Sequence, residues 1–245
     1  MRDHHGWRAR LGLVYMASST VMEPEFAAMC PEGVSFHTAR IHLPAPTVAG
    51  LTQMMADEET ERCVVDLARA PLHAIVFGGT SATFLQGGRW DEKIIARMEA
   101  RSGGIPVTTT STCSLAALRA FGARRIGVVT PYVDEVTDRA VRFLADNGFE
   151  IAAAAGMGIG EDHAIGAVST EDLYRFARDN AAPGADALFI SCTNLRTIGA
   201  IAALEEDLGM PVVSAIQASF WGTLRLAGVN ARRSGFGRLL DTPGM

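Results

Sequence analysis

The sequence lacks a long apolar segment, a paired-cysteine motif and a phosphate-binding loop, and each absence excludes a class of protein. Its longest apolar runs are interrupted by glycine, serine or a charged residue well before the roughly 20 residues that a membrane helix needs. Residues 1–10 are polar and contain no apolar stretch, so no signal peptide is expected. The sequence therefore predicts a cytoplasmic protein with no membrane partner.

The cysteines are few and far apart in the chain, and no two of them form a CxxC pair. They are Cys30, Cys63, Cys113 and Cys192. This spacing is typical of a protein from a reducing compartment, and it predicts neither a disulfide framework nor a zinc or other metal site.

Signals for nucleic acid and nucleotide binding are also missing. The formal net charge of −5 disfavours nucleic acid as the main partner. Neither a GxxxxGK[ST] loop nor a GxGxxG fingerprint stands at the end of a predicted strand, and the glycine-rich segment 156–160 is a weak signal. We therefore expect no cofactor. The oligomeric state is left open, and a homo-oligomer is compatible with the sequence.

Short apolar segments alternate with amphipathic helical segments along the whole chain of 245 residues, of which 48% are hydrophobic. The predicted strands are 11–15, 34–43, 73–77, 106–109, 126–130, 149–155, 187–192 and 212–215. This alternation predicts an α/β protein with two similar Rossmann-like domains, each a four-stranded parallel sheet flanked by helices. Ligands of such sheets bind beyond the carboxyl ends of the strands, so we expect the active site in the cleft between the domains.

The two halves of the chain resemble each other, which fixes the expected domain boundaries. In the first half a buried strand runs into Gly78, Gly79 and Thr80, and in the second a buried strand runs into Ser191, Cys192 and Thr193. The repeat pairs Gly79 with Cys192. We predict a first domain over residues 1–122 plus 220–245, which includes the C-terminal helix and tail, and a second domain over 123–219.

Cys192 is the strongest catalytic candidate. It follows the apolar run 187–190, and an amphipathic segment opens at Leu195, so the thiol is expected at a helix N-terminus. Unpaired backbone N–H groups there favour negative charge, which would tune the thiol towards neutral pH for general acid–base work. A nucleophilic role is also open, although no histidine is locally placed to activate it. The alternative is a structural cysteine, because cysteine is commonly buried.

The residues expected at the strand ends are mostly neutral hydrogen-bond donors, with no arginine or lysine among them. They are Ser18, Ser19, Gly79, Thr80, Ser81, Thr110, Tyr132, Asp162, Cys192, Thr193 and Asn194. Such a lining suits a carboxylate or an enediolate, so the expected partner is a small carboxylic or dicarboxylic acid. Cys113 lies at another predicted strand-to-helix junction, where packing is the favoured interpretation.

These motifs resemble the aspartate/glutamate racemase superfamily, in the branch that holds arylmalonate decarboxylase and maleate isomerase. The segments 22–26, 36–40 and 191–196 are similar to maleate isomerases, whereas Gly79-Thr80-Ser81 and 236–239 resemble the decarboxylase. The resemblance implies two facing cysteines in racemases and maleate isomerases, and one cysteine opposite a glycine in the decarboxylase. Gly79 matches the one-cysteine pattern.

The resemblance implies a cofactor-independent decarboxylase of a substituted malonate. Thr80, Ser81, Tyr132 and backbone N–H groups near Cys192 would form a dioxyanion hole for the enediolate, and Cys192 would protonate it. The alternative is a maleate cis–trans isomerase or an aspartate/glutamate-type racemase, with Cys113 or a hydroxyl as the second base; a carboxylate-binding protein without activity is a third reading.

Two positions depart from the pattern of these families. Asp162 stands where maleate isomerases place a carboxylate-binding asparagine, and Ser19 also replaces an asparagine. An ionised aspartate would repel a second carboxylate, so the natural substrate could carry an amine or a hydroxyl.

Overall fold

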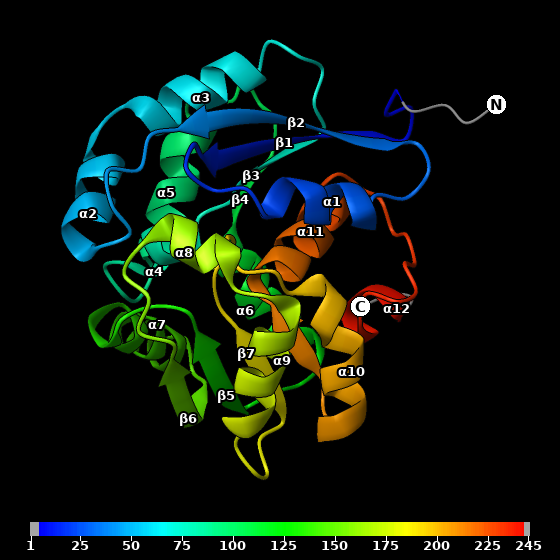
Figure 1. Ribbon diagram of the computed structural model, residues 1–245. Coiled ribbons are helices and arrows are strands. Elements are labelled where there is room, and N and C mark those ends of the chain that lie inside the picture. The colour runs from blue at the N-terminus through cyan, green and yellow to red at the C-terminus, as the bar shows by residue number, and fades with distance from the viewer. Residues whose placement is uncertain (1–4, 243–245) are drawn as a thin grey trace.

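The computed structural model describes residues 5–242 and contains two parallel four-stranded sheets, one in each half of the chain (Figure 1). The first sheet has the order β2-β1-β3-β4 and the second the order β6-β5-β7-β8, so both halves have the same topology. The strands are β1 (Ala9–Met16), β2 (Val34–Ile41), β3 (Ala74–Phe77), β4 (Val107–Thr109), β5 (Arg125–Thr130), β6 (Glu150–Gly156), β7 (Ala187–Ile190) and β8 (Val212–Ser214). The predicted fold class is confirmed.

Helices flank both sheets. In the first half they are α1 (Met22–Met29), α2 (Val48–Ala56), α3 (Glu59–Leu67), α4 (Thr80–Phe84), α5 (Trp90–Glu99) and α6 (Thr110–Ala120). In the second half and the C-terminal segment they are α7 (Asp134–Asp146), α8 (Asp162–Ala167), α9 (Thr170–Asp179), α10 (Ile198–Leu208), α11 (Ala215–Leu226) and α12 (Arg238–Asp241). Within residues 5–242, no helix has both the length and the apolar character that a membrane crossing requires.

The central strands are buried on both faces, because helices cover each sheet. Every residue of β3 and of β7 is buried, which is why both strands read as continuous apolar runs rather than as alternating patterns. Each of these strands ends at the same edge of its sheet as its parallel neighbours. The polar residues that follow β3 and β7 are therefore brought to that edge.

Hydroxyl side chains set several helix starts. Thr109 accepts a hydrogen bond from the Thr112 amide at the start of α6, and Ser214 accepts one from the Gln217 amide at the start of α11. These caps fix the starts of α6 and α11 at Thr110 and Ala215.

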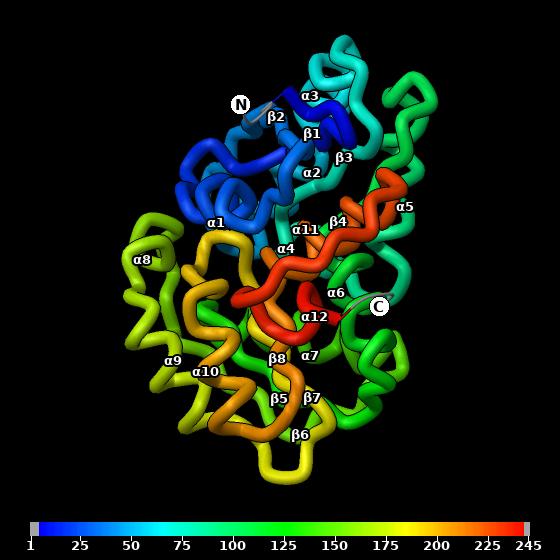
Figure 2. The backbone as a smooth tube through the Cα atoms, turned by 90° about the vertical axis from the view of Figure 1, so that its right-hand side faces the viewer, coloured from blue at the N-terminus to red at the C-terminus, as the bar shows by residue number. Residues whose placement is uncertain are grey.

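The C-terminal segment returns to the first half of the molecule. Figure 2 shows the chain after β8, in orange and red, running back between the two sheets. Helix α11 packs against α6, α1 and the strands β3 and β4 of the first sheet. These contacts support a first domain completed by the C-terminal segment, which we retain as a proposal. Its proposed limit at residue 220 falls inside α11, and residues 1–4 and 243–245 lie outside the described part of the chain.

Candidate active site

A small pocket lies where the strand ends of the two halves meet. It is lined by Met16, Ser19, Leu43, Pro46, Leu51, Gly79, Thr80, Ser81, Ala82, Tyr132, Asp162, Ile165, Cys192, Thr193 and Asn194. All the site residues singled out in the predicted cleft, Ser19, Gly79, Thr80, Ser81, Tyr132, Asp162, Cys192, Thr193 and Asn194, are in this set. Two further strand-end residues, Ser18 and Thr110, are not among the lining residues. The cavity volume is about 20 Å³, which is space for about one water molecule.

Cys192 has an unusual backbone. Its φ of 104° lies in the left-handed region, and it is the one non-glycine residue with a positive φ among residues 5–242. A side chain at such a φ is strained, typically by about 1–3 kcal/mol, and strain of this kind is commonly retained at functional sites. The Asn194 amide donates a hydrogen bond to Cys192 Sγ at 3.3 Å, so the turn after β7 presents a backbone N–H to the thiol.

The pKa of the thiol is raised, whereas the sequence predicts a thiol tuned towards neutral pH. Burial raises the pKa of Cys192 to about 12, and the nearby charge of Asp162 also raises it, whereas the Asn194 amide and the Tyr132 hydroxyl lower it. The predicted helix N-terminus is wrong in detail, since α10 begins only at Ile198. The N-terminus of α10 therefore lies beyond the turn and not at Cys192.

The turn at residues 191–197, here called the Cys192 loop, is held by the first half of the chain. The Tyr15 hydroxyl donates to the Thr193 carbonyl at 2.7 Å, and Thr193 Oγ1 donates to the Gly78 carbonyl at 2.8 Å. The Thr20 amide donates to Asn194 Oδ1 at 3.0 Å. These bonds fix the thiol relative to the end of β3.

Glu25 anchors the far end of the Cys192 loop. Its carboxylate accepts from the amides of Thr197 at 2.7 Å and Ile198 at 3.2 Å, so a side chain of α1 caps the start of α10. Burial raises the pKa of Glu25 to about 7, although the hydrogen bonds from Thr197 and Ile198 lower it. Sequence reasoning missed Tyr15 and Glu25 as supports of the site, because their partners are 178 and 172 residues away.

Two buried hydroxyls beside the thiol have no hydrogen-bond partner. Within residues 5–242, Thr80 Oγ1 and Ser191 Oγ make no hydrogen bond of good geometry, although the Tyr132 hydroxyl lies near both. Tyr132 is itself buried, and burial, followed by the nearby Cys192, raises its pKa well above the usual range. Buried unpaired hydroxyls are costly, and Thr80 lines the pocket, so its hydroxyl is suited to receive a ligand with acceptor atoms.

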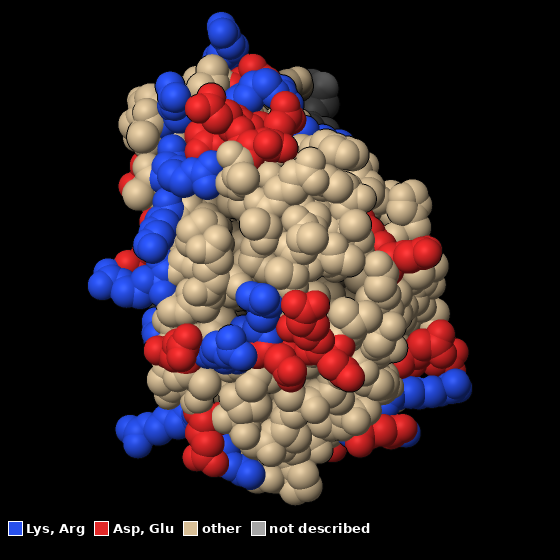
Figure 3. Space-filling model, turned by 90° about the vertical axis from the view of Figure 1, so that its left-hand side faces the viewer, with Lys and Arg blue, Asp and Glu red and all other residues tan. Residues whose placement is uncertain are grey.

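Asp162 is the only charged residue among those that line the pocket, as far as residues 5–242 are concerned. Ser18 Oγ and Ser19 Oγ donate to its Oδ2 at 2.7 and 2.9 Å, and Asn194 Nδ2 donates to its backbone carbonyl at 2.8 Å. Figure 3 shows the side of the molecule that carries α2 and α7, where a broad uncharged area lies between an acidic patch at the top and a cluster of mixed charges lower down.

Gly79 occupies the position that pairs with Cys192 in the repeat. Its φ of −137° is ordinary extended backbone, so conformation does not require glycine here. The lack of space favours glycine instead, because a Cβ added at position 79 would lie 2.5 Å from Met16 Cε and 2.6 Å from Phe77 Cε1. The first half therefore contributes hydroxyls and a close-packed backbone to the pocket, and no thiol.

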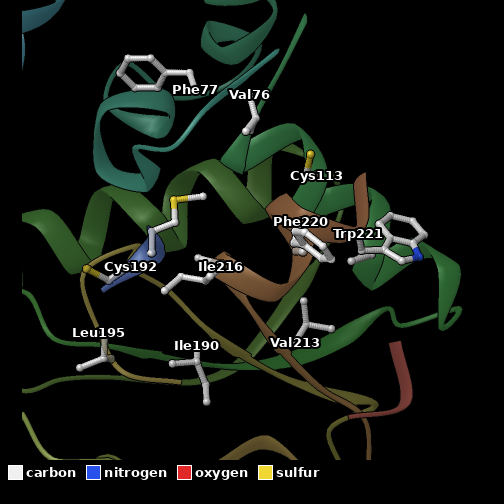
Figure 4. Packing of buried hydrophobic residues seen from close by; sticks show 14 of the residues in the cluster. Val76, Phe77, Cys113, Ile190, Cys192, Leu195, Val213, Ile216, Phe220 and Trp221 are labelled. Carbon is white, nitrogen blue, oxygen red and sulfur yellow. The ribbon is translucent and has the colours of Figure 1, made fainter. Parts of the chain in front are cut away.

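Cys113 is not part of the pocket. It is buried where α6 crosses α11, and a Cβ added to Gly222 would lie 2.4 Å from its Sγ. Its thiol lies 3.3 Å from Thr108 Oγ1. Figure 4 shows Cys113 beside Phe220 and Trp221, well apart from Cys192. The packing interpretation of Cys113 accounts for this position, and a role as second base does not.

Within residues 5–242, no group of three or more histidine, cysteine, aspartate or glutamate side chains is arranged to hold a metal ion. Among the described residues, the functional groups that line the pocket are a thiol, hydroxyls, an amide and one carboxylate.

Comparisons with known proteins agree with the fold. The family model of arylmalonate decarboxylase matches residues 11–240. Arylmalonate decarboxylase of Bordetella bronchiseptica is 39% identical over 166 residues, which cover 66% of this chain and 69% of that protein.

Two solved structures extend the likeness to almost the whole chain. A liganded variant of arylmalonate decarboxylase, with one glycine replaced by cysteine and one cysteine by serine, has a TM-score of 0.88 and 31% identity, covering 95% of this chain and 99% of that one. A cysteine-to-serine variant of Nocardia farcinica maleate cis-trans isomerase, with a covalently bound succinylcysteine intermediate, has a TM-score of 0.89 and 26% identity, covering 95% and 98%. The chain belongs to the arylmalonate decarboxylase family, within the aspartate/glutamate racemase-like superfamily.

Proposed function

We propose that this protein is a cofactor-independent decarboxylase of a substituted malonate, with Cys192 as the proton donor. One observation carries the proposal: among the described residues that line the pocket, Cys192 supplies the one thiol, and the paired position in the other half is Gly79. Decarboxylation needs one proton donor on one face of the carbanion. Two-base racemisation needs a second base on the opposite face.

One carboxylate of the malonate would occupy the place of the water-sized cavity. The unpaired hydroxyl of Thr80, the hydroxyls of Ser81 and Tyr132, and the backbone N–H groups of the Cys192 loop are the donors available to it. Such a cluster of fixed dipoles stabilises an enediolate more than the starting carboxylate, because charge moves onto the held oxygens as the reaction proceeds.

The second carboxylate leaves as carbon dioxide. The bond from this carboxylate to the central carbon breaks, and its electron pair forms the enediolate of the remaining acid. Met16, Leu43 and Ile165 supply apolar surface in the pocket, which would replace the hydration shell of the leaving group. The Cys192 thiol then transfers its proton to the central carbon, and the resulting thiolate takes a proton from water before the next turnover.

The high pKa of Cys192 suits this direction of proton transfer. With a pKa of about 12, the thiol is already in the form that donates. A carbanion is a stronger base than the thiolate that the transfer leaves behind, so the step is downhill. Nucleophilic attack would first require removal of this proton in a desolvated site.

Substrate entry requires movement of the pocket walls. A cavity of about 20 Å³ does not hold a substituted malonate, and Leu43, Pro46 and Leu51 are the apolar side chains contributed by the segment from β2 to α2. Displacement of this segment would open the pocket without disturbing the Cys192 loop, which is held by Tyr15, Gly78 and Glu25.

Maleate isomerisation is the second candidate, favoured by the full-length likeness to the Nocardia farcinica enzyme. That protein forms a covalent succinylcysteine, which requires a nucleophilic cysteine. For this chain, the protonated state of Cys192 and the absence of a second thiol from the described pocket residues favour decarboxylation.

The test is to incubate the purified protein separately with phenylmalonate, maleate and aspartate in deuterated water. Release of carbon dioxide with one deuterium in the product supports the proposal. Isomerisation of maleate, or deuterium exchange into aspartate without loss of carbon dioxide, would replace it with the second candidate. Saturable binding with no turnover of any of the three would leave a carboxylate-binding protein.

A further inference from the structure

The pocket has a negative charge on its wall and no positive charge to balance it. Among the described lining residues, Asp162 is charged and the others are neutral. A malonate dianion placed beside Cys192 would face this carboxylate across a largely apolar space, where charges are poorly screened. An apolar substituent on the substrate would do nothing to reduce that repulsion.

Asp162 is held in place by hydrogen bonds from several elements. The hydroxyls of Ser18 and Ser19, in the segment after β1, donate to Asp162 Oδ2. The side-chain Nδ2 of Asn194, in the Cys192 loop, donates to the backbone carbonyl of Asp162. The side chain of Asn194 is fixed in turn by the Thr20 amide. An aspartate anchored in this way cannot swing far from an approaching anion, so its carboxylate keeps a fixed place in the pocket.

The same carboxylate is well placed to recognise a donor. Asp162 acts electrostatically on Cys192, since its charge raises the pKa of the thiol, so the two groups are close within one pocket. A substituent on the carbon that receives the proton from Cys192 is therefore near Asp162. An ammonium or hydroxyl group on that carbon would be attracted to the carboxylate, whereas a methyl group would leave it desolvated.

We propose that Asp162 is a specificity-determining residue, and that it selects malonates whose central carbon carries an ammonium or hydroxyl group. This inference rests on the proposed function, because it names the substrate class of the same pocket. Ser18 and Ser19 position the carboxylate, and Asp162 itself contacts the substituent. The preferred substrate is therefore a 2-amino- or 2-hydroxymalonate and not a malonate with apolar substituents only.

The experiment uses three matched substrates, 2-phenylmalonates with a methyl, hydroxyl or amino group as the second substituent. They share the phenyl group that stabilises the carbanion and differ in one small group. Carbon dioxide release is measured for the wild-type protein and for Asp162→Asn, Asp162→Val and Glu161→Gln, with the uncatalysed rate subtracted. Glu161→Gln is the matched control, because Glu161 is the exposed neighbour and loses the same charge outside the pocket.

For the wild-type protein we expect kcat/KM for the amino substrate to exceed that for the methyl substrate by at least about tenfold. Asp162→Asn keeps the shape and should reduce this preference by about tenfold, and Asp162→Val should reverse it. Glu161→Gln should change neither. A wild-type preference for the methyl substrate that is unchanged in Asp162→Asn would overturn the inference and leave the decarboxylase intact.

Binding of the three compounds, measured by calorimetry on the same proteins, separates this inference from the proposed function. Suppose that neither the wild-type protein nor any variant releases carbon dioxide, but the amino compound binds at least about tenfold more weakly to Asp162→Asn than to the wild-type protein. The selectivity of Asp162 is then supported and the decarboxylase function is refuted. Equal binding of all three compounds to the wild-type protein and to Asp162→Asn, without turnover, would remove both. Asp162→Asn retains hydrogen-bonding atoms for Ser18 and Ser19, so it provides the test if Asp162→Val does not fold.

Discussion

The ends of β3 and β7 are equivalent positions in the two halves, yet at neither position does the backbone φ favour the residue that is found there. Gly79, after β3, has an extended φ of −137° that any residue adopts. Cys192, after β7, has a φ of 104° that favours glycine. The two strand ends therefore cannot have been matched to their residues by backbone conformation alone.

The difference indicates what each position does. Gly79 is small because Met16 and Phe77 occupy the space of its Cβ, so its role is close packing at the pocket wall. Cys192 keeps a side chain in spite of strain, which supports the proposal that its role is chemical. In that proposal the two halves differ at one pair of positions, where one half supplies a surface and the other a reactive group.

Removing the thiol should have the largest effect on this asymmetry. Cys192→Ser is expected to reduce kcat for decarboxylation by about 10²–10⁴-fold, because a hydroxyl is a far weaker proton donor than a thiol. Cys113→Ser removes a buried thiol outside the pocket and should change kcat only a few-fold. Carbon dioxide release measures both. Full activity in Cys192→Ser would show that the two strand ends do not differ in chemical role.

The Cys192 loop has an anchor, Glu25, whose effect on stability depends on pH. Because the folded-state pKa is raised to about 7, the native protein binds a proton more tightly than the unfolded chain does. This favourable contribution is complete below the unfolded pKa of roughly 4.5 and is lost as the pH rises through 7. The free energy of unfolding should fall by up to about 3 kcal/mol from this group between pH 4 and pH 8.

Glu25→Gln removes that titration and should make the dependence flatter. The measurement is the difference in denaturant midpoint between wild type and variant across this pH range. Glu23→Gln, on the same helix but paired with Arg40 at the surface, is the control and should leave the wild-type slope in place. Identical slopes for wild type and Glu25→Gln would mean that burial does not perturb this carboxyl.

Placing a second thiol at the first strand end should reduce the asymmetry. Gly79→Cys is expected to cost about 1–3 kcal/mol of stability, because its Cβ overlaps Met16 and Phe77. Combining it with Met16→Ala should recover part of that loss and allow racemisation of a chiral 2-arylpropionate. The racemisation is measured as deuterium exchange from the solvent. Gly79→Ala reports the cost of the Cβ without the thiol. A stable double variant with no exchange would argue against a facing geometry.

The smallest expected effect concerns strain. Cys192→Gly should be more stable than Cys192→Ala by about 1 kcal/mol, because only glycine accepts the positive φ without a steric penalty. At position 79 glycine is also expected to be more stable than alanine, but for another reason: Gly79→Ala loses stability through packing and not through φ. Thermal melts of the three variants measure these differences in stability. A Cys192→Ala variant more stable than Cys192→Gly would contradict the interpretation that Cys192 is strained.

Much of the fold follows from local patterns. Continuous apolar runs such as Ala187–Ile190 are buried strands, and the repeat of strand and helix fixes two sheets of one topology. The pocket residues could be collected because parallel strands end at a shared edge. Their roles in substrate binding and catalysis remain predictions, since the structure shows where these residues lie and not what they do.

The parts that sequence reasoning missed depend on distant contacts. Burial sets the protonation state of Cys192, and no local pattern reports how much water reaches a thiol. Tyr15 looks like an ordinary apolar strand residue, although its hydroxyl holds Thr193. Met16 and Leu51 cannot be told from core residues before the tertiary structure is known, although both line the pocket.

The anchoring of the Cys192 loop by Tyr15, Gly78 and Glu25 has a consequence for how activity arises during folding. The reactive sulfur belongs to the later-synthesised half, whereas the groups that hold its turn belong to the earlier one. Neither half alone contains the full set of restraints. We therefore expect the Cys192 loop to reach its final geometry only when the halves dock, so that a chain cut between them would need reassembly to restore it.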